Sequence, residues 1–505
     1  MAPGSGSSSA TPAAADRSTG GAPLLTPAQE RALVAVEHRR WRVDALVLGV
    51  AALLLRLPMY FAPRSLVFDD GVFASSAFAM RAGELPFRDV FSSQGPLFLP
   101  LVYLGDLVGL RTLDAPRVLS VAAGVLVTIA TYSCARHLTT RANALFAAAL
   151  VTTSGSILWV TGPINADGAS LALSVLAVAF ALRYRADPRL ANALLVGLAA
   201  GAAVSIKALA VPAVLVAGVV VLASHKKVVH AASAALLGLA VYVLAAVPWG
   251  IERVWEQSFR YHDQAVRQDS AAGSLGKVLS TLWDRDLLVV VALVMAVATW
   301  ALVRGGLVSR APIGGGRRFV PAIVALVLWS TLVIALLVWE PALWRAHVAH
   351  VVVPLALLAA LRPPPWRVLA IAGLLLVPIA AIQQHDLLWP HGYEGEQAAV
   401  VTRLESLGDG ALVISDDPGL VWRAGHRPPG ALADASFQRI DNGDITVDRL
   451  VRAASRRDVC GVLVTSPDHF GRFTTLGERL GAVGYLPERF GPRITLYGRP
   501  GCESA

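Results

Sequence analysis

The sequence predicts an all-α polytopic membrane protein of about eleven transmembrane helices that carries a C-terminal extracytoplasmic α/β domain. Of its 505 residues, 55% are hydrophobic and only 16% are charged. Leu, Ala and Val gather in runs close to the roughly 20 apolar residues that a helix needs to cross a bilayer. From about His391 the composition becomes soluble and strand-containing, which predicts a separate domain at the C-terminus.

The basic residues of this chain indicate membrane topology rather than a nucleic-acid partner. The formal net charge is +9, but Lys and Arg stand at the ends of apolar segments and do not form a stripe among aromatic residues. The segments that we expect to span the bilayer lie near residues 44–62, 116–135, 143–160, 168–183, 190–204, 208–223, 229–248, 286–303, 319–339, 347–361 and 367–383.

Alternating these spans places most of the basic residues on one side. Cytoplasmic loops are enriched in Lys and Arg, and the loops on the side of the N-terminus contain Arg39, Arg40, Arg42, Arg136, Arg141, Arg183, Arg185, Arg189, Lys226, Lys227, Arg304, Arg310, Arg317, Arg318, Arg362 and Arg367. We therefore expect a multi-pass protein of the cytoplasmic membrane with a cytoplasmic N-terminus. An odd number of spans then leaves the C-terminal domain outside.

The predicted organisation has three parts. Residues 1–30 lack an apolar core and are expected to form a disordered cytoplasmic tail rather than a signal peptide. Residues 31–390 form the membrane domain, which includes a first outer loop at 63–115. Within this loop, residues 96–110 are apolar but short, and we expect an interfacial or re-entrant helix there rather than a span.

Residues 391–505 are expected to form the extracytoplasmic α/β domain. Strand-like stretches lie at 411–417, 458–466 and 493–499, and helical stretches lie at 396–407, 446–456 and 474–483. Cys460 and Cys502 both fall in this domain, and an oxidising exterior would allow them to pair. The sequence alone does not supply the separation that a disulfide needs, so their pairing stays open.

The first outer loop begins with two adjacent carboxylates, Asp69 and Asp70. The following segment, GVFASSAFAMRAG, places apolar residues at helical spacing, which suits a helix lying along the membrane surface. One interpretation makes Asp70 the N-cap of this helix and Asp69 a favourable charge near its positive end. The other, which we favour, makes the pair a general base and its electrostatic partner beside a cavity.

Several short motifs carry a family resemblance. The acidic pair is followed by G-x-L-P-F-R-D-V-F at 83–91 and by an apolar helix from Gly95-Pro96, Asp167 lies in GPINADGAS, and Lys207 lies in VSIKALAVP. With WRAHVAHVVVPLALLAAL at 344–361, this pattern resembles the membrane-embedded GT-C glycosyltransferases, especially the dolichyl-phosphate-mannose protein mannosyltransferase and aminoarabinose transferase group.

The resemblance implies sugar transfer from a polyprenyl-phosphate donor to a lipid, glycan or protein acceptor on the outer face of the cytoplasmic membrane. It implies catalytic roles for Asp69, Asp70 and Asp167, with one acid of the first loop as the base. Cations would stabilise the leaving phosphate, and the candidates are Lys207, Arg345, His347, His350 and Arg88. Membrane lipids are expected partners, and nucleic acid is not.

The chain departs from the family pattern at two places. Many relatives have Asp-Glu at the first-loop pair, whereas this chain has Asp69-Asp70. Many also carry a basic residue and Pro-Pro after the R-D-V-F element, where this chain has Gln94 and Gly95. These differences put the reach of the second acid and any phosphate or acceptor contact from this turn in question.

Each candidate residue also has a structural alternative. Lys207 can snorkel from the end of a span, and Asp167 can cap the helix that follows it. His347 and His350 lie three residues apart on one helical face and can form a buried, hydrogen-bonded pair; without a nearby carboxylate they would make a poor zinc site. No cofactor is required by the sequence. A divalent cation at Asp69 and Asp70 stays open, because carboxylates suit hard cations, but no spacing demands one.

Two other classes of function remain. A transporter or lipid flippase also places carboxylates and a lysine among membrane helices, although its acids would not be needed for sugar chemistry. A non-catalytic relative with a binding outer domain would tolerate the loss of both acids. A nucleotide-sugar donor is less suitable, because the sequence has no Gly-rich phosphate loop after a strand in any cytoplasmic segment.

Overall fold

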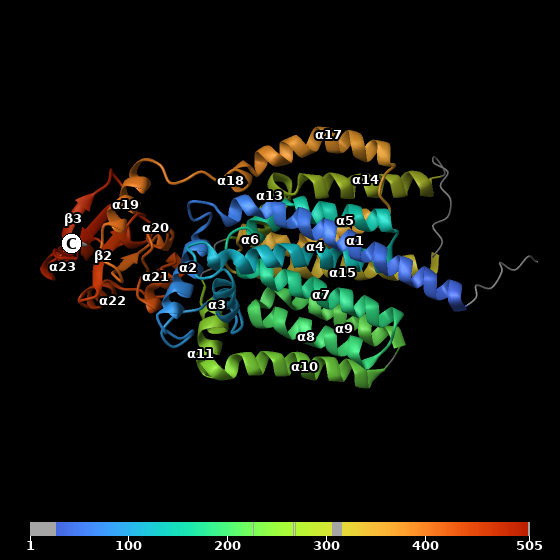
Figure 1. The fold of residues 1–505 in the computed structure, drawn as a ribbon, viewed down its shortest axis with the longest axis horizontal. Helices are drawn as coiled ribbons and strands as arrows, with labels where there is room; N and C mark the ends of the chain where they lie inside the picture. Colours follow the sequence, from blue (N-terminus) through green and yellow to red (C-terminus); the bar gives the residue numbers. More distant parts are fainter. Residues whose placement is uncertain (1–26, 226, 266, 268, 306–315, 503–505) are drawn as a thin grey trace, which may run out of the picture. The chain divides into compact units, whose positions relative to one another are not determined.

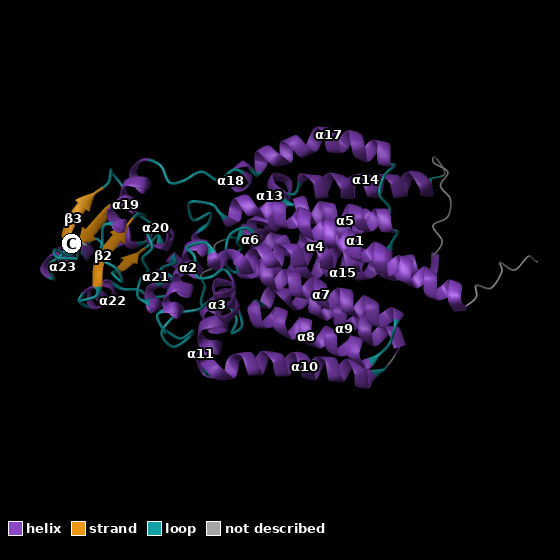
Figure 2. Ribbon diagram, viewed as in Figure 1, coloured by secondary structure: helices purple, strands orange, loops and turns teal. Residues whose placement is uncertain are grey.

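A computed structural model describes residues 27–225, 227–265, 267, 269–305 and 316–502. Most of the predicted cytoplasmic tail, residues 1–26, lies outside the described residues. The chain divides into two compact units, Met1–Leu46 and Val47–Ala505, and the packing below concerns the second. Its helices and its small sheet are drawn in Figures 1 and 2.

Seven helices in the described part of the chain are long and apolar enough to cross a membrane. They are α1 (Pro27–Tyr60), α4 (Val118–Leu138, preceded by η1, Ala115–Arg117), α7 (Ala166–Ala186), α10 (Val228–Ala246), α14 (Leu287–Arg304), α15 (Gly316–Trp339) and α17 (Trp366–Gln383). Each coincides with a predicted span. The protein is therefore a polytopic membrane protein.

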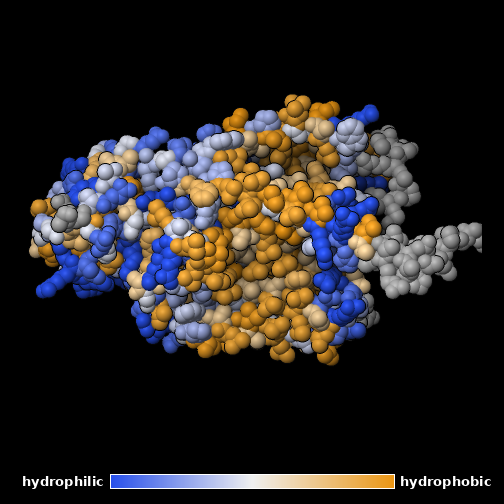
Figure 3. All heavy atoms as spheres, viewed as in Figure 1, coloured by the Kyte–Doolittle hydropathy of each residue, from blue (hydrophilic) through white to orange (hydrophobic). Residues whose placement is uncertain are grey.

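The outward faces of these helices are apolar. Leu374 and Ile382 of α17 and Leu244 of α10 are more than 70% exposed, and Figure 3 shows hydrophobic residues gathered over the helices on one face. Because soluble proteins rarely expose apolar patches of this extent, we interpret this surface as facing lipid.

The span predicted at residues 143–160 is broken in the structure. Helix α5 (Arg141–Thr153) and helix α6 (Gly155–Thr161) meet at Ser154 with a bend of 61°. The Ser154 hydroxyl accepts a hydrogen bond from the Ile157 amide and donates one to Oδ1 of Asp286 at 2.5 Å. The serine thereby caps α6, which stabilises a second helix start in place of a continuous helix.

The remaining predicted spans are shorter helices. They are α8 (Leu190–Ile206), α9 (Val211–His225, preceded by η2, Ala208–Ala210) and α16 (Ala349–Leu361, preceded by η5, Arg345–Val348). Helix α3 (Phe98–Val108) is also short, as expected for residues 96–110. Helix α16 is buried along nearly its whole length, so it lies inside the bundle. Helices α8, α9 and α3 each keep an exposed apolar face, which includes Leu198, Leu215 and Leu104.

Helix α2 (Phe68–Arg81) differs from its prediction in two respects. It begins ahead of the acidic pair, with Val67 at the N-cap position, so Asp70 lies in the first turn and the alternative in which it caps the helix is wrong. The helix is also buried from Asp70 to Ala77 instead of lying with one face free. Helix α20 of the C-terminal domain (Pro418–Arg423) packs across it, and a Cβ atom at Gly71 would overlap the backbone of Gly419.

The other long loop, between α10 and α14 and called the second outer loop below, is a series of short helices. It comprises η3 (Val247–Trp249), α11 (Ile251–Trp255), the π-helical turn η4 (Glu256–Arg260), α12 (Tyr261–Asp263) and α13 (Ala271–Arg285). The Gln257 side chain donates to the Phe87 carbonyl at 2.9 Å and accepts from the Ser92 amide at 3.0 Å. The two outer loops are therefore hydrogen-bonded to each other.

The C-terminal domain contains a four-stranded sheet of order β1-β2-β4-β3. Strands β1 (Leu412–Ser415) and β2 (Val459–Val464) are parallel, and β4 (Thr495–Gly498) pairs antiparallel with both β2 and β3 (Leu486–Arg489). Strand β3 was not predicted, because its residues LPER are exposed and lack an apolar alternation. The helices and turns of the domain are α19 (Gly395–Glu405), α20, η6 (Gly430–Leu432), α21 (Phe437–Asp441), α22 (Val447–Ala454), η7 (Phe470–Arg472) and α23 (Leu476–Ala482). The short helix α18 (His385–Leu388) precedes the domain.

The structure answers the cysteine question that the sequence left open. Cys460 and Cys502 form a disulfide, with their Cα atoms 5.7 Å apart. Cys460 lies in β2 and Cys502 near the described end of the chain, so the bond ties the segment after β4 to the sheet.

Ion pairs join the C-terminal domain to the first outer loop. Arg427 contacts Glu84 at 2.5 Å and Arg423 contacts Asp114 at 2.6 Å. The second carboxylate oxygen of Glu84 accepts from the Gly430 amide at 2.9 Å. With the close packing of α20 on α2, these partly buried contacts hold the domain against the loop that carries the acidic pair.

Candidate functional site

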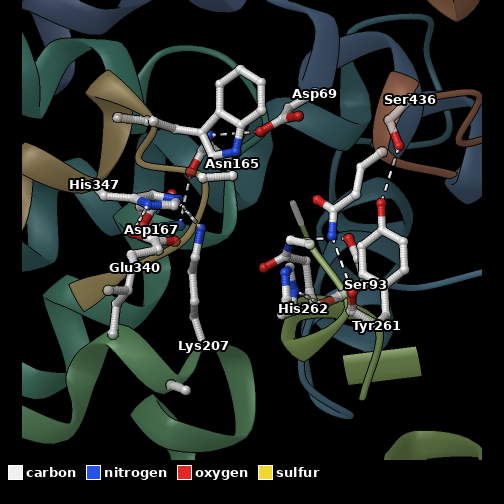
Figure 4. Close-up of a pocket in the computed structure, with 18 of the residues that line it drawn as sticks. Asp69, Ser93, Asn165, Asp167, Lys207, Tyr261, His262, Glu340, His347 and Ser436 are labelled. Atoms are coloured by element: carbon white, nitrogen blue, oxygen red, sulfur yellow. Dashed lines mark hydrogen bonds and ion pairs between the residues drawn. The ribbon is translucent and has the colours of Figure 1, made fainter. Parts of the chain in front are cut away.

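The described residues line an open-sided cavity of about 670 Å³ where the helix ends, both outer loops and the C-terminal domain meet (Figure 4). The residues from the first loop and the helix ends include Phe68, Asp69, Gln94, Gly95, Trp159, Asn165, Asp167 and Lys207. Those from later elements include Tyr261, His262, Arg285, Trp339, Glu340, Trp344, Arg345, His347, Asp434, Ser436, Phe437, Gln438 and His469. Acidic, basic and aromatic groups thus line one cavity.

Asp69 is the member of the acidic pair that faces this cavity. Its Oδ2 accepts one hydrogen bond, from the side-chain Nδ2 of Asn165 at 3.2 Å. Burial raises the pKa of Asp69 to about 6; Lys207 opposes the rise, and the neighbouring charges of Asp167 and Asp434 add to it. A carboxylate with a pKa near 6 is ionised at neutral pH and can still accept a proton, as a general base must.

Asp70 lies outside the cavity lining in a buried ion pair with Arg117. The guanidinium Nη2 is 2.5 Å from Oδ2, and Nε donates to Oδ1 at 3.2 Å. The carboxylate also accepts from the Leu66 and Ile164 amides. With four hydrogen bonds, Asp70 joins the start of α2 to Leu66 just before it, to Ile164 just before α7 and to Arg117.

A connected row of charged and polar side chains also lines the cavity. Nζ of Lys207 lies 2.8 Å from Oδ2 of Asp167 and 3.0 Å from Nε2 of His347. Nδ1 of His347 in turn lies 2.7 Å from Glu340. Lys207 is at the break between α8 and η2, where its extended backbone aims the side chain at the start of α7. The alternative in which Lys207 snorkels from the end of a span is wrong, because its ammonium pairs with Asp167 inside the protein.

Contacts at the start of α7 correct two expectations from the sequence. Asn165, rather than Asp167, caps α7, since its side-chain oxygen accepts from the Asp167 amide at 2.8 Å. The two histidines do have carboxylates nearby: Asp167 lies 3.3 Å from Nε2 of His350, which stands behind it, and Glu340 contacts His347. Among the residues described, however, no group of three or more His, Cys, Asp and Glu side chains is arranged to hold a metal ion.

The other two predicted cations differ in placement. Arg345 lines the cavity, is about half exposed and lies 3.6 Å from Asp284. Arg88 is exposed, pairs with its neighbour Asp89 at 2.8 Å and does not line the cavity. The structure thus brings Asp69, Asp167, Lys207, Arg345 and His347 together at the cavity. Asp70, Arg88 and His350 do not line it.

Arg285 is a cavity-lining cation that sequence reasoning missed. Its guanidinium lies over the Trp159 ring at 4.3 Å. Burial, together with the nearby positive charge of Arg345, lowers its pKa to about 10, so it stays protonated at neutral pH. Its position immediately before the 286–303 span, on the predicted outer side where basic residues are few, was the signal that could have identified it.

The turn that departs from the family pattern has a structural role. Gly95 packs so closely on the end of α8 that a Cβ atom would overlap the Ser205 carbonyl. The Gly95 amide also donates to the Ile206 carbonyl at 2.9 Å. The absence of a side chain here lets the first loop approach the residues just before Lys207.

The second outer loop closes another side of the cavity. Nε2 of His262 lies 2.9 Å from the Ser93 carbonyl, and the Ser258 hydroxyl donates to the Gln94 carbonyl at 2.6 Å. Burial lowers the pKa of His262, so this imidazole is neutral at neutral pH. It holds the loop in place without adding charge.

The fold is that of a polytopic membrane protein of the GT-C type, as its similarity to solved structures shows. Residues 94–251 match the family model of dolichyl-phosphate-mannose-protein mannosyltransferases, and this match confirms the resemblance that the sequence suggested. No curated protein matches the sequence significantly.

Solved structures show the same architecture. ArnT from Cupriavidus metallidurans bound to undecaprenyl phosphate is similar with a TM-score of 0.61 and 16% identity, over 91% of this chain and 99% of that chain. The archaeal oligosaccharyltransferase AglB from Archaeoglobus fulgidus, in complex with an inhibitory peptide and a dolichol-phosphate, is similar with a TM-score of 0.51 and 12% identity, over 92% of this chain and 75% of that chain. At these identities the similarity establishes the fold.

Proposed function

We propose that the protein transfers a sugar from a polyprenyl-phosphate donor to an acceptor hydroxyl at the outer face of the cytoplasmic membrane. The observation that carries this proposal is the cavity, which is lined both by the carboxylate of Asp69 and by the cations Lys207, Arg345 and Arg285. Two structural neighbours support the lipid class, since one was solved with undecaprenyl phosphate and the other with a dolichol-phosphate.

The proposed reaction is a displacement at the anomeric carbon of the donor. Asp69 takes the proton of the acceptor hydroxyl while the oxygen forms a bond to that carbon. The bond from the carbon to the phosphate oxygen breaks, and the electron pair leaves with the lipid phosphate. General-base assistance of this kind contributes about 10²- to 10⁴-fold in rate.

The cations of the cavity would stabilise the phosphate as it gains charge. Arg285 and Arg345 offer planar, bidentate donors that suit phosphate oxygens. Lys207 is already paired with Asp167 at 2.8 Å, so we assign Asp167 the role of positioning Lys207. His347, held between Lys207 and Glu340, keeps this arrangement together.

A divalent cation does not fit the predicted pair. Asp70 is saturated by Arg117 and two backbone amides, which leaves Asp69 without a second carboxylate from this pair. We therefore derive no step through a metal ion. The acceptor, whether lipid, glycan or protein, is left to experiment.

The proposal includes an orientation. The cavity and residues 391–505 would lie on the extracytoplasmic side, with the N-terminus in the cytoplasm. Trp339 and Trp344 line the cavity and are exposed, and tryptophan is enriched at the membrane–water interface. They would mark the side on which the polyprenyl chain leaves the cavity for the bilayer.

The test is sugar release from a panel of synthetic polyprenyl-phosphate sugars by the purified protein in lipid nanodiscs. We expect Asp69→Asn to bind the donor and to lose about 10²-fold or more of the release rate. Asp409→Asn, an exposed residue of the C-terminal domain, is the matched control and should keep the rate. A flippase would instead move donor lipid across the bilayer equally well with either variant and release no sugar.

A further inference from the structure

The C-terminal domain supplies one wall of the cavity. Asp434, Ser436, Phe437, Gln438 and His469 line it together with residues of the membrane domain. Hydrogen bonds fix this wall: Gln438 donates to the Tyr261 carbonyl at 3.1 Å, and the hydroxyls of Tyr261 and Ser436 lie 3.2 Å apart. Figure 4 shows Tyr261 and Ser436 facing each other across the junction of the two domains.

The carboxylate of Asp434 is only partly satisfied within the described residues. Asp434 is 7% exposed, and its Oδ1 accepts one hydrogen bond, from the Ser436 amide at 2.9 Å. The nearby guanidinium of Arg439 donates to the backbone carbonyl of Asp434 at 2.6 Å rather than to its carboxylate. Buried carboxylates normally accept several hydrogen bonds. Oδ2 of Asp434 can therefore accept hydrogen bonds from donors that enter the cavity.

Aromatic rings lie on the same wall. The rings of Phe437 and Trp344 are 5.5 Å apart, and those of Phe437 and His469 are 6.1 Å apart. His469 also contacts Phe68, with ring centroids at 5.8 Å. Nδ1 of His469 is a buried atom without a hydrogen-bond partner in the described part of the chain, so the aromatic surface carries a further unused polar atom.

We propose that this wall, formed by Asp434, Ser436, Phe437, His469, Trp344 and Tyr261, is a subsite for a sugar ring. A sugar has hydroxyl donors for the Asp434 carboxylate and an apolar C–H face for the aromatic rings. A phosphate would be repelled by Asp434, and a hydrocarbon tail would leave its buried carboxylate unpaired. The inference rests on the proposed function and assigns the C-terminal domain a direct part in substrate recognition.

The sugar can belong either to the donor or to a glycan acceptor, and binding measurements separate the two. In nanodiscs, and in an Asp69→Asn background that prevents turnover, we would measure the Kd of undecaprenyl phosphate with and without mannose, glucose, galactose or arabinose. A second series adds the methyl glycosides and homodisaccharides of these sugars to protein loaded with bare undecaprenyl phosphate.

For a donor subsite, we expect a sugar-bearing lipid to bind more tightly than the bare lipid. Asp434→Asn should remove about 10-fold or more of that gain, as for loss of a hydrogen bond to a charged group. For an acceptor subsite, the same loss should appear in the second series only. Phe437→Leu, which keeps an apolar side chain, should weaken the same probe, whereas Asp409→Asn should leave all values unchanged.

The inference is overturned if neither series shows sugar-dependent binding, or if that binding survives both Asp434→Asn and Phe437→Leu. Binding of bare undecaprenyl phosphate reports whether a variant is folded, since it should be unaffected. The proposed function fails by a different result, because it is refuted when the protein with Asp69 intact releases no sugar from any donor or when Asp69→Asn leaves release intact.

Discussion

Replacing Asp70 with Asn should destabilise the protein far more than the same change at Asp69. The Asp70 carboxylate accepts four hydrogen bonds, from the Leu66 and Ile164 amides and twice from Arg117. An asparagine side chain has one oxygen, and its NH₂ group is a donor, so it would face other donors. The change also leaves the buried guanidinium of Arg117 without its counter-charge.

The expected cost follows from this geometry. Both side chains of the Asp70–Arg117 pair are 0% exposed, and removing one partner of such a buried pair costs about 3–5 kcal/mol. That is a large part of the roughly 5–15 kcal/mol by which folded domains are stable. Arg117 also donates to the carbonyls of Tyr60, Ala62 and Arg64, so its displacement would loosen the approach to α2.

Asp69→Asn provides the matched control. Asp69 accepts a single hydrogen bond, at 3.2 Å. Because its pKa is raised to about 6 in the folded protein, the folded state holds a proton that the unfolded state loses as the pH rises above about 4. Folding therefore loses stability through this window, and at pH 7.5 a neutral amide at position 69 should leave stability equal or slightly higher.

The assay is thermal and denaturant unfolding of the purified variants in nanodiscs at pH 7.5. We expect the free energy of unfolding of Asp70→Asn to lie about 3–5 kcal/mol below that of Asp69→Asn. Equal unfolding midpoints for the two variants would refute the reasoning. A stable Asp70→Asn variant that releases no sugar would instead show that Asp70 takes part in the reaction.

Three further predictions follow from the site. The kcat/KM for sugar transfer should rise with pH through about 6, as Asp69 loses its proton; a pH–rate profile that is flat between pH 5 and 7 would contradict this role. Lys207→Met should lower thermal stability because it leaves the buried Asp167 without its lysine partner, and adding Asp167→Asn should restore stability without restoring transfer; recovery of transfer in the double variant would argue against a phosphate role. Gly71→Ala should push the C-terminal domain off α2, at a cost of about 1–3 kcal/mol, which limited proteolysis would detect as easier release of that domain. Gly276→Ala, which has open space around it, should be without effect.

The helices were largely predictable from the sequence. Each of the eleven segments is helical in the structure, because the length of an apolar run is a local property that a bilayer constrains directly. The bend at Ser154 was not predictable in this way, since it depends on a hydrogen bond to Asp286, which is 132 residues away. Strand β3 was missed for a related reason: its pairing with β4, and not its own composition, makes it a strand.

The roles within the acidic pair could not be separated by sequence alone. Asp69 and Asp70 are adjacent and chemically identical, but successive residues of a helix point about 100° apart. One carboxylate therefore reaches the cavity, and the other reaches Arg117, 47 residues further along the chain. Only the position of η1 beside α2 decides which acid keeps a free oxygen.

The sequence by itself determined the membrane class, the helical segments, the strands β1, β2 and β4, and the candidate residues Asp69, Asp167, Lys207 and His347 that meet at the cavity. These features depend on composition, periodicity and short motifs, which are local. The tertiary structure decided the partners: Lys207 with Asp167, Asp70 with Arg117, and the Asp434 wall against the second outer loop. Such contacts join residues that are 40 to 175 positions apart, and packing of the whole chain brings them within hydrogen-bond distance.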